Sequence, residues 1–159
     1  MWLNITKYTY ADGNIDADWY NMDFEFIGDG KTVLGLDDDA ARANWGGQWR
    51  IPTAEHIQEL LNNTNAERYM LKGVDGYKFT SKVNGNTIFL PAAGCIFGNK
   101  LMNVGTYGEY SSSSLDTSYG SYAASIILFY DDSCEKTNLN RYIAISIRPI
   151  IKGAKPFAE

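Results

Sequence analysis

Two cysteines and a single histidine are the residues of this chain best suited to nucleophilic or metal chemistry. Cys95 and Cys134 permit one disulfide, and two unpaired thiols fit the same count equally well. Since His56 is the only histidine, a site with several histidine ligands is excluded and a Ser-His-Asp triad would have to use that residue. A reactive thiolate needs a neighbouring cation or a helix N-terminus, and only Lys136 lies close in sequence. We therefore predict no catalytic residue and no enzyme activity.

Acidic residues form two small groups that invite comparison with metal or acid-base sites. The first group resembles the start of a calcium loop, in which alternate oxygen ligands converge on the ion: Asp12, Asn14, Asp16 and Asp18. However, Ala17 stands where such a loop needs glycine and Asp23 where it needs glutamate, which favours a solvated acidic loop. Asp38 and Asp39 directly precede an alanine-rich run, where a helix cap explains them better than a pair of catalytic acids. We predict no metal site and no cofactor.

The segment from Gly105 to Pro149 has the side-chain mixture of a binding surface. It interleaves tyrosines with serines and asparagines, and a run of four serines starts at Ser111. Tyrosine supplies a large contact area at the cost of two torsions, while serine and asparagine supply adaptable hydrogen bonds. Strands also favour aromatic and hydroxyl residues, so an ordinary β-rich domain is the alternative.

Composition limits the chain to one domain and excludes several classes of partner. A chain of 159 residues with 45% hydrophobic content can bury one sizeable core. The net charge of -5 and the lack of a basic run argue against a nucleic-acid partner. The longest apolar run, Ile126 to Tyr130, is far shorter than the ~20 residues of a membrane helix, so no membrane insertion is expected. The start of the chain also lacks the features of a signal peptide.

Hydrophobic periodicity predicts two helices followed by strands. Helices are expected near 38–45 and 54–62, the second with Ile57, Leu60 and Leu61 on one buried face. Asn84-Gly85 predicts a hairpin between strands at 76–81 and 87–90. Further strands are expected at 122–130 and 142–150, and a short one at 23–27. Segregated helices and strands indicate an α+β domain, with two helices packed on antiparallel sheets and long loops between them.

Several short segments occur in an order that resembles a known family. They are Asp38-Asp39-Ala40-Ala41, Trp45-Gly46-Gly47-Gln48-Trp49-Arg50-Ile51-Pro52-Thr53, Gln58-Glu59-Leu60, Gly76-Tyr77-Lys78, Asn86-Thr87-Ile88-Phe89-Leu90-Pro91-Ala92-Ala93-Gly94, Gly108-Glu109-Tyr110 and Ser146-Ile147-Arg148-Pro149-Ile150. Together they resemble the Fibrobacter succinogenes major paralogous domain of gut Bacteroidetes, from Leu3 to Ile150. That family implies a C-type-lectin-like fold related to the formylglycine-generating enzymes, with residues 38–104 as scaffold.

The resemblance implies a binding function for residues 105–150. Members of the family are similar to the variable proteins of diversity-generating retroelements, in which a C-terminal segment of a ligand-binding domain is rewritten. The implied ligand-binding positions are Asp116, Tyr119, Tyr122, Ala124, Ile127, Phe129, Lys136, Asn138, Asn140, Tyr142 and Ile143. Tyr119, Tyr122, Phe129 and Tyr142 would be exposed aromatic anchors. The expected partner is a cell-surface protein or glycan, and the expected place is a bacterial cell surface or a phage virion, as in an adhesin.

Two alternatives and several departures accompany this resemblance. An unvaried interaction domain of a larger bacterial surface protein would share the fold, and a formylglycine-type enzyme would need a cysteine pair whose spacing differs from Cys95 and Cys134. The calcium-dependent sugar motifs of lectins are absent, so the fold implies no lectin sugar site.

Some framework positions carry expectations of their own. Thr53 is expected to cap the second helix, and His56 stands where the family usually has the glutamate of the capping box, so the reciprocal hydrogen bond to the Thr53 amide should be weakened. Trp45 and Trp49 are expected in the core, and Arg148 is expected to be a buried framework residue.

Overall fold

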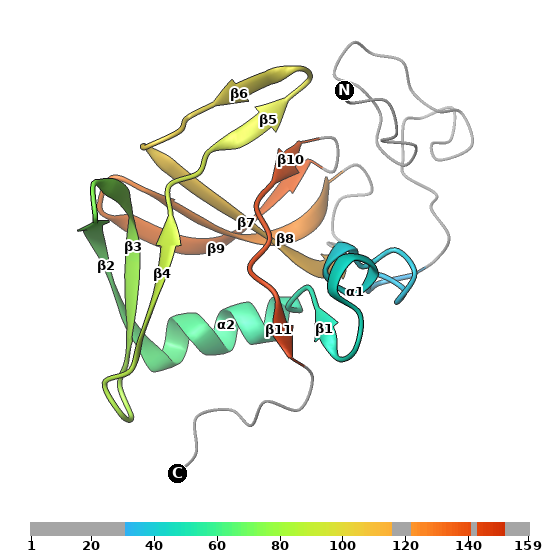
Figure 1. Cartoon of the computed structure of the whole chain (residues 1–159), viewed down its shortest axis with the longest axis horizontal. Coiled ribbons are helices and arrows are strands. Elements are labelled where there is room, and N and C mark those ends of the chain that lie inside the picture. The colour runs from blue at the N-terminus through green and yellow to red at the C-terminus, as the bar shows by residue number, and fades with distance from the viewer. Residues whose placement is uncertain (1–30, 116–121, 141–142, 152–159) are drawn as a thin grey trace.

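The computed structural model describes residues 31–115, 122–140 and 143–151. The strand expected at 23–27 and the acidic loop from Asp12 to Asp23 lie outside the described residues. In the described part, two helices precede a series of antiparallel sheets, which confirms the predicted α+β class (Figure 1). Neither of these helices has the length and apolar character needed to cross a membrane.

Both helices begin at the predicted caps. Helix α1, Ala40–Trp45, starts after Asp39, whose carboxylate accepts from the amides of Ala41 and Arg42 at 2.9 and 3.0 Å. The second oxygen of Asp39 accepts from the Ile51 amide at 2.8 Å, so this buried carboxylate also fixes the chain that follows the helix. A cap with three such bonds is a structural group rather than half of a catalytic acid pair.

Helix α2, Ala54–Asn63, begins with a complete capping box. The Thr53 hydroxyl accepts from the His56 amide, and the His56 Nδ1 accepts from the Thr53 amide at 3.2 Å. The reciprocal bond that we expected histidine to weaken is therefore present, because an imidazole nitrogen offers a lone pair as a glutamate oxygen does. Ile57 is buried, as predicted, and Leu60 and Leu61 pack against the core cluster.

The predicted hairpin around Asn84-Gly85 is confirmed as part of a three-stranded sheet. Strand β3, Val74–Ser81, pairs antiparallel with β4, Thr87–Pro91. Gly85 has φ of 73°, a backbone conformation that favours glycine. Strand β2, Thr64–Leu71, directly follows helix α2 and pairs with the other side of β3. No strand was expected over residues 64–71.

A second three-stranded sheet contains most of the segment expected to bind ligand. It consists of β7, Tyr107–Leu115, β8, Tyr122–Tyr130, and β9, Ser133–Asn140, in the order β7-β8-β9. The strand expected at 122–130 is confirmed. The register shifts between Ser111 and Leu115 and again between Tyr122 and Ala124, so the sheet is irregular at the same end in both pairings.

The single strand expected at 142–150 is wrong. That stretch contributes β10, Ala144–Ile145, which pairs with β5, Cys95–Phe97, and β11, Ile150–Ile151, which pairs with β1, Trp49–Arg50. Strand β6, Lys100–Met102, completes the β10-β5-β6 sheet. Pro149 has no amide hydrogen for a ladder, which interrupts the strand. Arg148 is exposed and Ile147 is 37% exposed, so the predicted burial of Arg148 is also wrong.

The core lies where helix α2 and the two larger sheets meet. Its buried members are Ile57, Tyr77, Phe79, Leu90, Ala92, Tyr110, Ile127 and Phe129. Helix α2 contacts β2 and all three strands of the β7-β8-β9 sheet, and Figure 1 shows it running along that sheet. Each large side chain buried in this way stabilises the fold by about 1.5–3 kcal/mol. The core therefore holds the C-terminal sheet firmly against the scaffold.

Candidate ligand-binding site

One end of the β7-β8-β9 sheet holds three of the predicted binding positions, Tyr122, Ala124 and Asn140. Across the sheet, Leu115 lies opposite Ala124, and Tyr122 lies opposite Asn140. We call this end of the three strands the sheet end. Three predicted residues, Asp116, Tyr119 and Tyr142, belong to connections outside the described residues.

Two of the predicted positions are buried in the core. Phe129 is 1% exposed and Ile127 is 3% exposed. The ring of Phe129 stacks on Tyr77, with 4.7 Å between the ring centroids. The prediction that Phe129 is an exposed aromatic anchor is therefore wrong. Successive strand residues point to opposite faces, and these two odd-numbered positions take the face that helix α2 covers.

Three further predicted residues are placed with different exposures. Lys136 and Asn138 are exposed, and Ile143 is half-buried. Lys136 is the register partner of Ile127, so it shares the helix-facing side of the sheet and lies at the margin of that side. The hydrogen bond with Thr53 lowers the pKa of Glu55, at the start of helix α2, and the positive charge of Lys136 adds to this effect.

The serine run at the end of β7 is framework rather than binding surface. Ser112 is 2% exposed and Ser113 is 6% exposed. The Ser113 amide donates to the Pro52 carbonyl at 2.7 Å, and its carbonyl accepts from the Leu34 amide at 2.8 Å. The Ser114 hydroxyl accepts from the Ala54 amide, the first of helix α2, at 3.0 Å. The Ser113 backbone and the Ser114 hydroxyl therefore pair with backbone groups of residue 34 and of residues 52–54.

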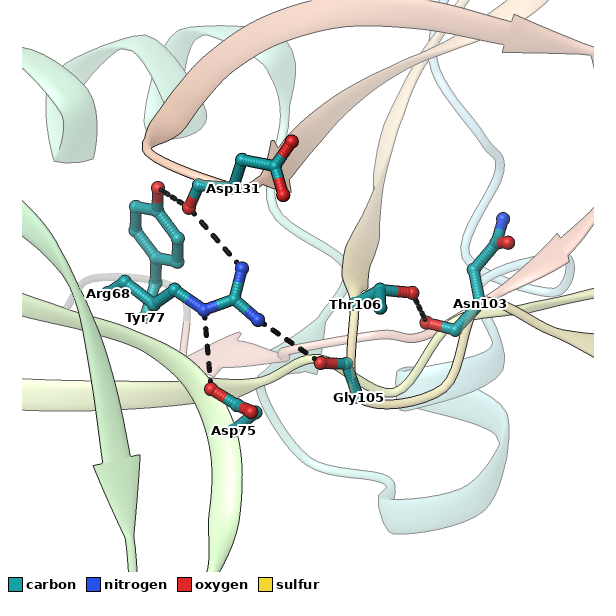
Figure 2. A network of polar contacts seen from close by, with 7 residues as sticks. All are labelled: Arg68, Asp75, Tyr77, Asn103, Gly105, Thr106 and Asp131. Carbon is teal, nitrogen blue, oxygen red and sulfur yellow. Dashed lines mark hydrogen bonds and ion pairs between the residues drawn. The ribbon is translucent and has the colours of Figure 1, made fainter.

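The opposite end of the same sheet is fixed by a polar network that the sequence analysis missed (Figure 2). The Arg68 guanidinium, from β2, donates to Asp75 Oδ1 at 3.3 Å, to the Gly105 carbonyl at 3.2 Å and to the Asp131 carbonyl at 3.5 Å. The Tyr77 hydroxyl donates to the same Asp131 carbonyl at 2.8 Å. Gly105 precedes β7 and Asp131 lies between β8 and β9. The network thus ties these two turns to the β2-β3 hairpin.

The two thiols have properties opposite to those of a catalytic cysteine pair. Both cysteines are free. Burial raises the pKa of Cys95 to about 11, helped by a hydrogen bond with Glu109. Burial also raises the pKa of Cys134 to about 12, with a further contribution from the negative charge of Glu135. A nucleophilic thiolate requires the pKa to fall, and both thiols stay protonated at neutral pH.

Other chemical sites are limited in the described residues. No group of three or more His, Cys, Asp and Glu side chains that could hold a metal ion occurs among them. An open apolar hollow of about 180 Å³ lies over the β10-β5-β6 sheet, lined by Ala93, Ile96, Leu101, Ala144 and Ile145. Because Ala144 follows Ile143, this hollow lies beside the last of the predicted binding positions.

Comparison of the chain with protein-family models, with curated proteins and with solved structures gives no match.

Proposed function

We propose that this chain is a non-catalytic ligand-binding domain with a C-type-lectin-like fold, and that it is the variable protein of a diversity-generating retroelement. The family resemblance of the ordered segments from Asp38 to Ile150 supports this proposal, as does the α+β arrangement. In this proposal the domain is displayed on a bacterial cell surface or a phage virion and binds a cell-surface protein or a glycan.

The observation that carries the proposal is the strand register at the sheet end. The pairings of Leu115 with Ala124 and of Tyr122 with Asn140 bring together positions that are scattered in sequence. In this proposal Asp116, Tyr119 and Tyr142, which lie outside the described residues, contribute to the same surface. A binding surface built from loops on a rigid scaffold is a common arrangement, because loops tolerate substitution while the scaffold positions them.

The packing of the sheet supports a preorganised surface. Phe129 and Ile127 hold the centre of β8 in the core, and the Arg68 network fixes the far end of all three strands. A backbone that is ordered before binding loses less conformational entropy when the ligand arrives. The proposed site therefore leaves out the two core residues, Ile127 and Phe129, and keeps the other predicted positions.

Substituting the tyrosines of the sheet end tests the proposal. The triple variant Tyr119→Ser, Tyr122→Ser and Tyr142→Ser is compared with the wild-type chain on a glycan array and on a panel of fixed bacterial cells. We expect a loss of at least tenfold in binding, since large aromatic anchors dominate such surfaces. The melting temperature should change by less than about 2 °C, because surface positions contribute little to stability.

A matched control uses a tyrosine far from the sheet end. Tyr69, on β2, is 41% exposed, and Tyr69→Ser should leave binding unchanged. If the triple variant binds as well as the wild-type chain, the sheet end is not the binding surface. If it unfolds instead, the three tyrosines are core residues and the site is misplaced.

The retroelement part of the proposal has a separate test in the flanking DNA. We expect a reverse transcriptase gene beside a near-copy of the coding segment for residues 110–150, with differences confined to adenines. A flanking region without either element would leave a ligand-binding domain whose surface is not rewritten.

A further inference from the structure

Helix α1 ends on a tryptophan that the described residues leave largely uncovered. Trp45 is 60% exposed, so the prediction that it packs in the core is wrong. Helix α1 has only six residues, and it buries Ala41 together with the cap residue Asp39. A single exposed apolar side chain is common at protein surfaces, whereas a group of them marks an interaction site, so the neighbours of Trp45 decide what it can do.

The turn after the helix holds the exposed ring in place. The Trp49 amide donates to the Gly46 carbonyl at 3.3 Å and closes the turn. This brings the half-buried Trp49 ring against Trp45 edge to face, with centroids 5.5 Å apart and planes at 73°. Trp49 in turn pairs across β1-β11 with Ile151, which is 44% exposed. The two rings form a preorganised aromatic corner.

The space above this turn is open. Gly46 and Gly47 have φ of 66° and 55°, and a Cβ added at either would meet no heavy atom within 4 Å. These glycines adopt a conformation that side chains disfavour, and they leave no side chain of their own beside the rings.

Two exposed amide side chains neighbour the tryptophans in sequence. Asn44 and Gln48 are both exposed and lie next to the two tryptophans in the chain. The Asn44 amide nitrogen donates to the Ala40 carbonyl at 2.7 Å, which fixes its side chain and leaves the amide oxygen as an acceptor. Each side chain amide offers both donors and acceptors. The segment thus combines exposed aromatic surface with amide groups one residue away in the chain.

We propose that Trp45, Trp49, Asn44 and Gln48 form a carbohydrate-binding site, separate from the sheet end. A pyranose ring with equatorial hydroxyls has an apolar C–H face, which can stack on the exposed Trp45 ring, and a rim of hydroxyls, which can pair with the amides of the neighbouring residues. A quaternary ammonium ion would need aromatic rings on several sides. These two rings touch edge to face, which leaves no room between them for a cation. The ligand class is therefore a neutral sugar that stacks on Trp45.

Nuclear magnetic resonance titration tests the site directly. The indole N–H signals of the ¹⁵N-labelled chain are followed as cellohexaose, xylohexaose or mannohexaose is added. We expect the Trp45 and Trp49 signals to shift with a millimolar dissociation constant for at least one of these probes. Trp45→Ala should weaken that binding at least about tenfold, equivalent to ~1.4 kcal/mol. Trp45→Phe should retain part of the affinity, because a smaller ring still stacks.

Controls separate this site from instability and from the proposed function. Tyr69→Ala removes another exposed aromatic and should bind the sugar as the wild-type chain does. The triple tyrosine variant of the sheet end should also keep sugar binding, so either site can fail without the other. Three results would overturn the inference. They are no binding of any of the three probes, unchanged binding by a folded Trp45→Ala variant, and a self-association of the chain that Trp45→Ala abolishes.

Discussion

Removing the Arg68 guanidinium should destabilise the chain measurably although Arg68 lies at the protein surface. Its side chain is 32% exposed, and the ion pair with Asp75, itself 31% exposed, is screened by solvent. Such pairs contribute about 0–1 kcal/mol. The two bonds to the carbonyls of Gly105 and Asp131 are long, at 3.2 and 3.5 Å, and add about 0.5 kcal/mol each. Arg68→Ala should therefore lower the free energy of unfolding by about 1–2 kcal/mol.

The Tyr77 hydroxyl allows the shared carbonyl to be tested separately. Tyr77 is 2% exposed, and burial raises the pKa of its phenol, which keeps the hydroxyl protonated as a donor to Asp131. Tyr77→Phe should cost about 1 kcal/mol, because the carbonyl still accepts from Arg68. In the double variant the Asp131 carbonyl loses both of its donors. The loss in the free energy of unfolding should then exceed the sum of the two single losses by about 0.5 kcal/mol or more.

Urea unfolding followed by circular dichroism gives the free energy of unfolding of the wild-type chain, the two single variants and the double variant, which together form a double-mutant cycle. Glu67→Gln is the matched control, since it removes an exposed ion pair with Lys78 on the same sheet and should change the unfolding free energy by less than about 0.5 kcal/mol. Additive effects of Arg68→Ala and Tyr77→Phe would refute a shared acceptor. An Arg68→Ala variant as stable as the wild-type chain would refute the role of the network.

Three further outcomes follow from the packing and the thiols. Gly108→Ala should cost about 1–3 kcal/mol in urea unfolding, because its new Cβ would overlap the ring of Phe129, and an unchanged midpoint would show that the ring moves aside. Ser114→Ala should cost about 1 kcal/mol by the same assay, since the first amide of helix α2 loses its acceptor; no loss would mean that water replaces it. Because the pKa values of Cys95 and Cys134 are raised from 9.0 to about 11 and about 12, their contribution to stability should be complete below pH 9 and be lost as the pH rises toward 12. Iodoacetamide should label both thiols at pH 8 much more slowly than a free cysteine peptide, and rapid labelling of the folded chain would contradict the burial.

The helices were predictable because their signals are local. A helix start depends on one side chain and the amides two or three residues ahead, so Asp39 and Thr53 reveal it without tertiary information. The hairpin at Gly85 is local for the same reason, since its turn requires a residue that accepts positive φ.

The missed strands depend on partners far away in sequence. Strand β2 is an edge strand whose side chains are exposed after Thr64, so it shows no alternation of polar and apolar residues. Strand β9 is another edge strand with a mainly polar sequence, Ser133–Asn140. Conversely, the alternating isoleucines of 143–147 predicted one strand. The backbone instead forms two short strands, β10, which pairs with β5, and β11, which pairs with β1.

The candidate site was only partly predictable because register decides which side chains are exposed. Ile127 and Phe129 occur within the same strand as the predicted anchor Tyr122, and strand alternation alone does not tell which face of that strand packs on the core. The register shift between Tyr122 and Ala124 also interrupts the alternation of the two strand faces, so one inward-outward pattern does not hold along the whole of β8. The network around Arg68 carried no sequence signal at all, because its acceptors are main-chain carbonyls in distant turns.

The buried positions limit how a rewritten segment could vary in this fold. Truncating a fully buried phenylalanine costs about 3–5 kcal/mol, and a domain has only about 5–15 kcal/mol of stability in total. Replacing Phe129 by a small or polar side chain would therefore remove a large share of the stability of the fold. Lys136 is exposed, and substitutions there cost little. Under the proposed function, diversity that survives folding is concentrated at the sheet end, because the same strands that display this surface also form the core.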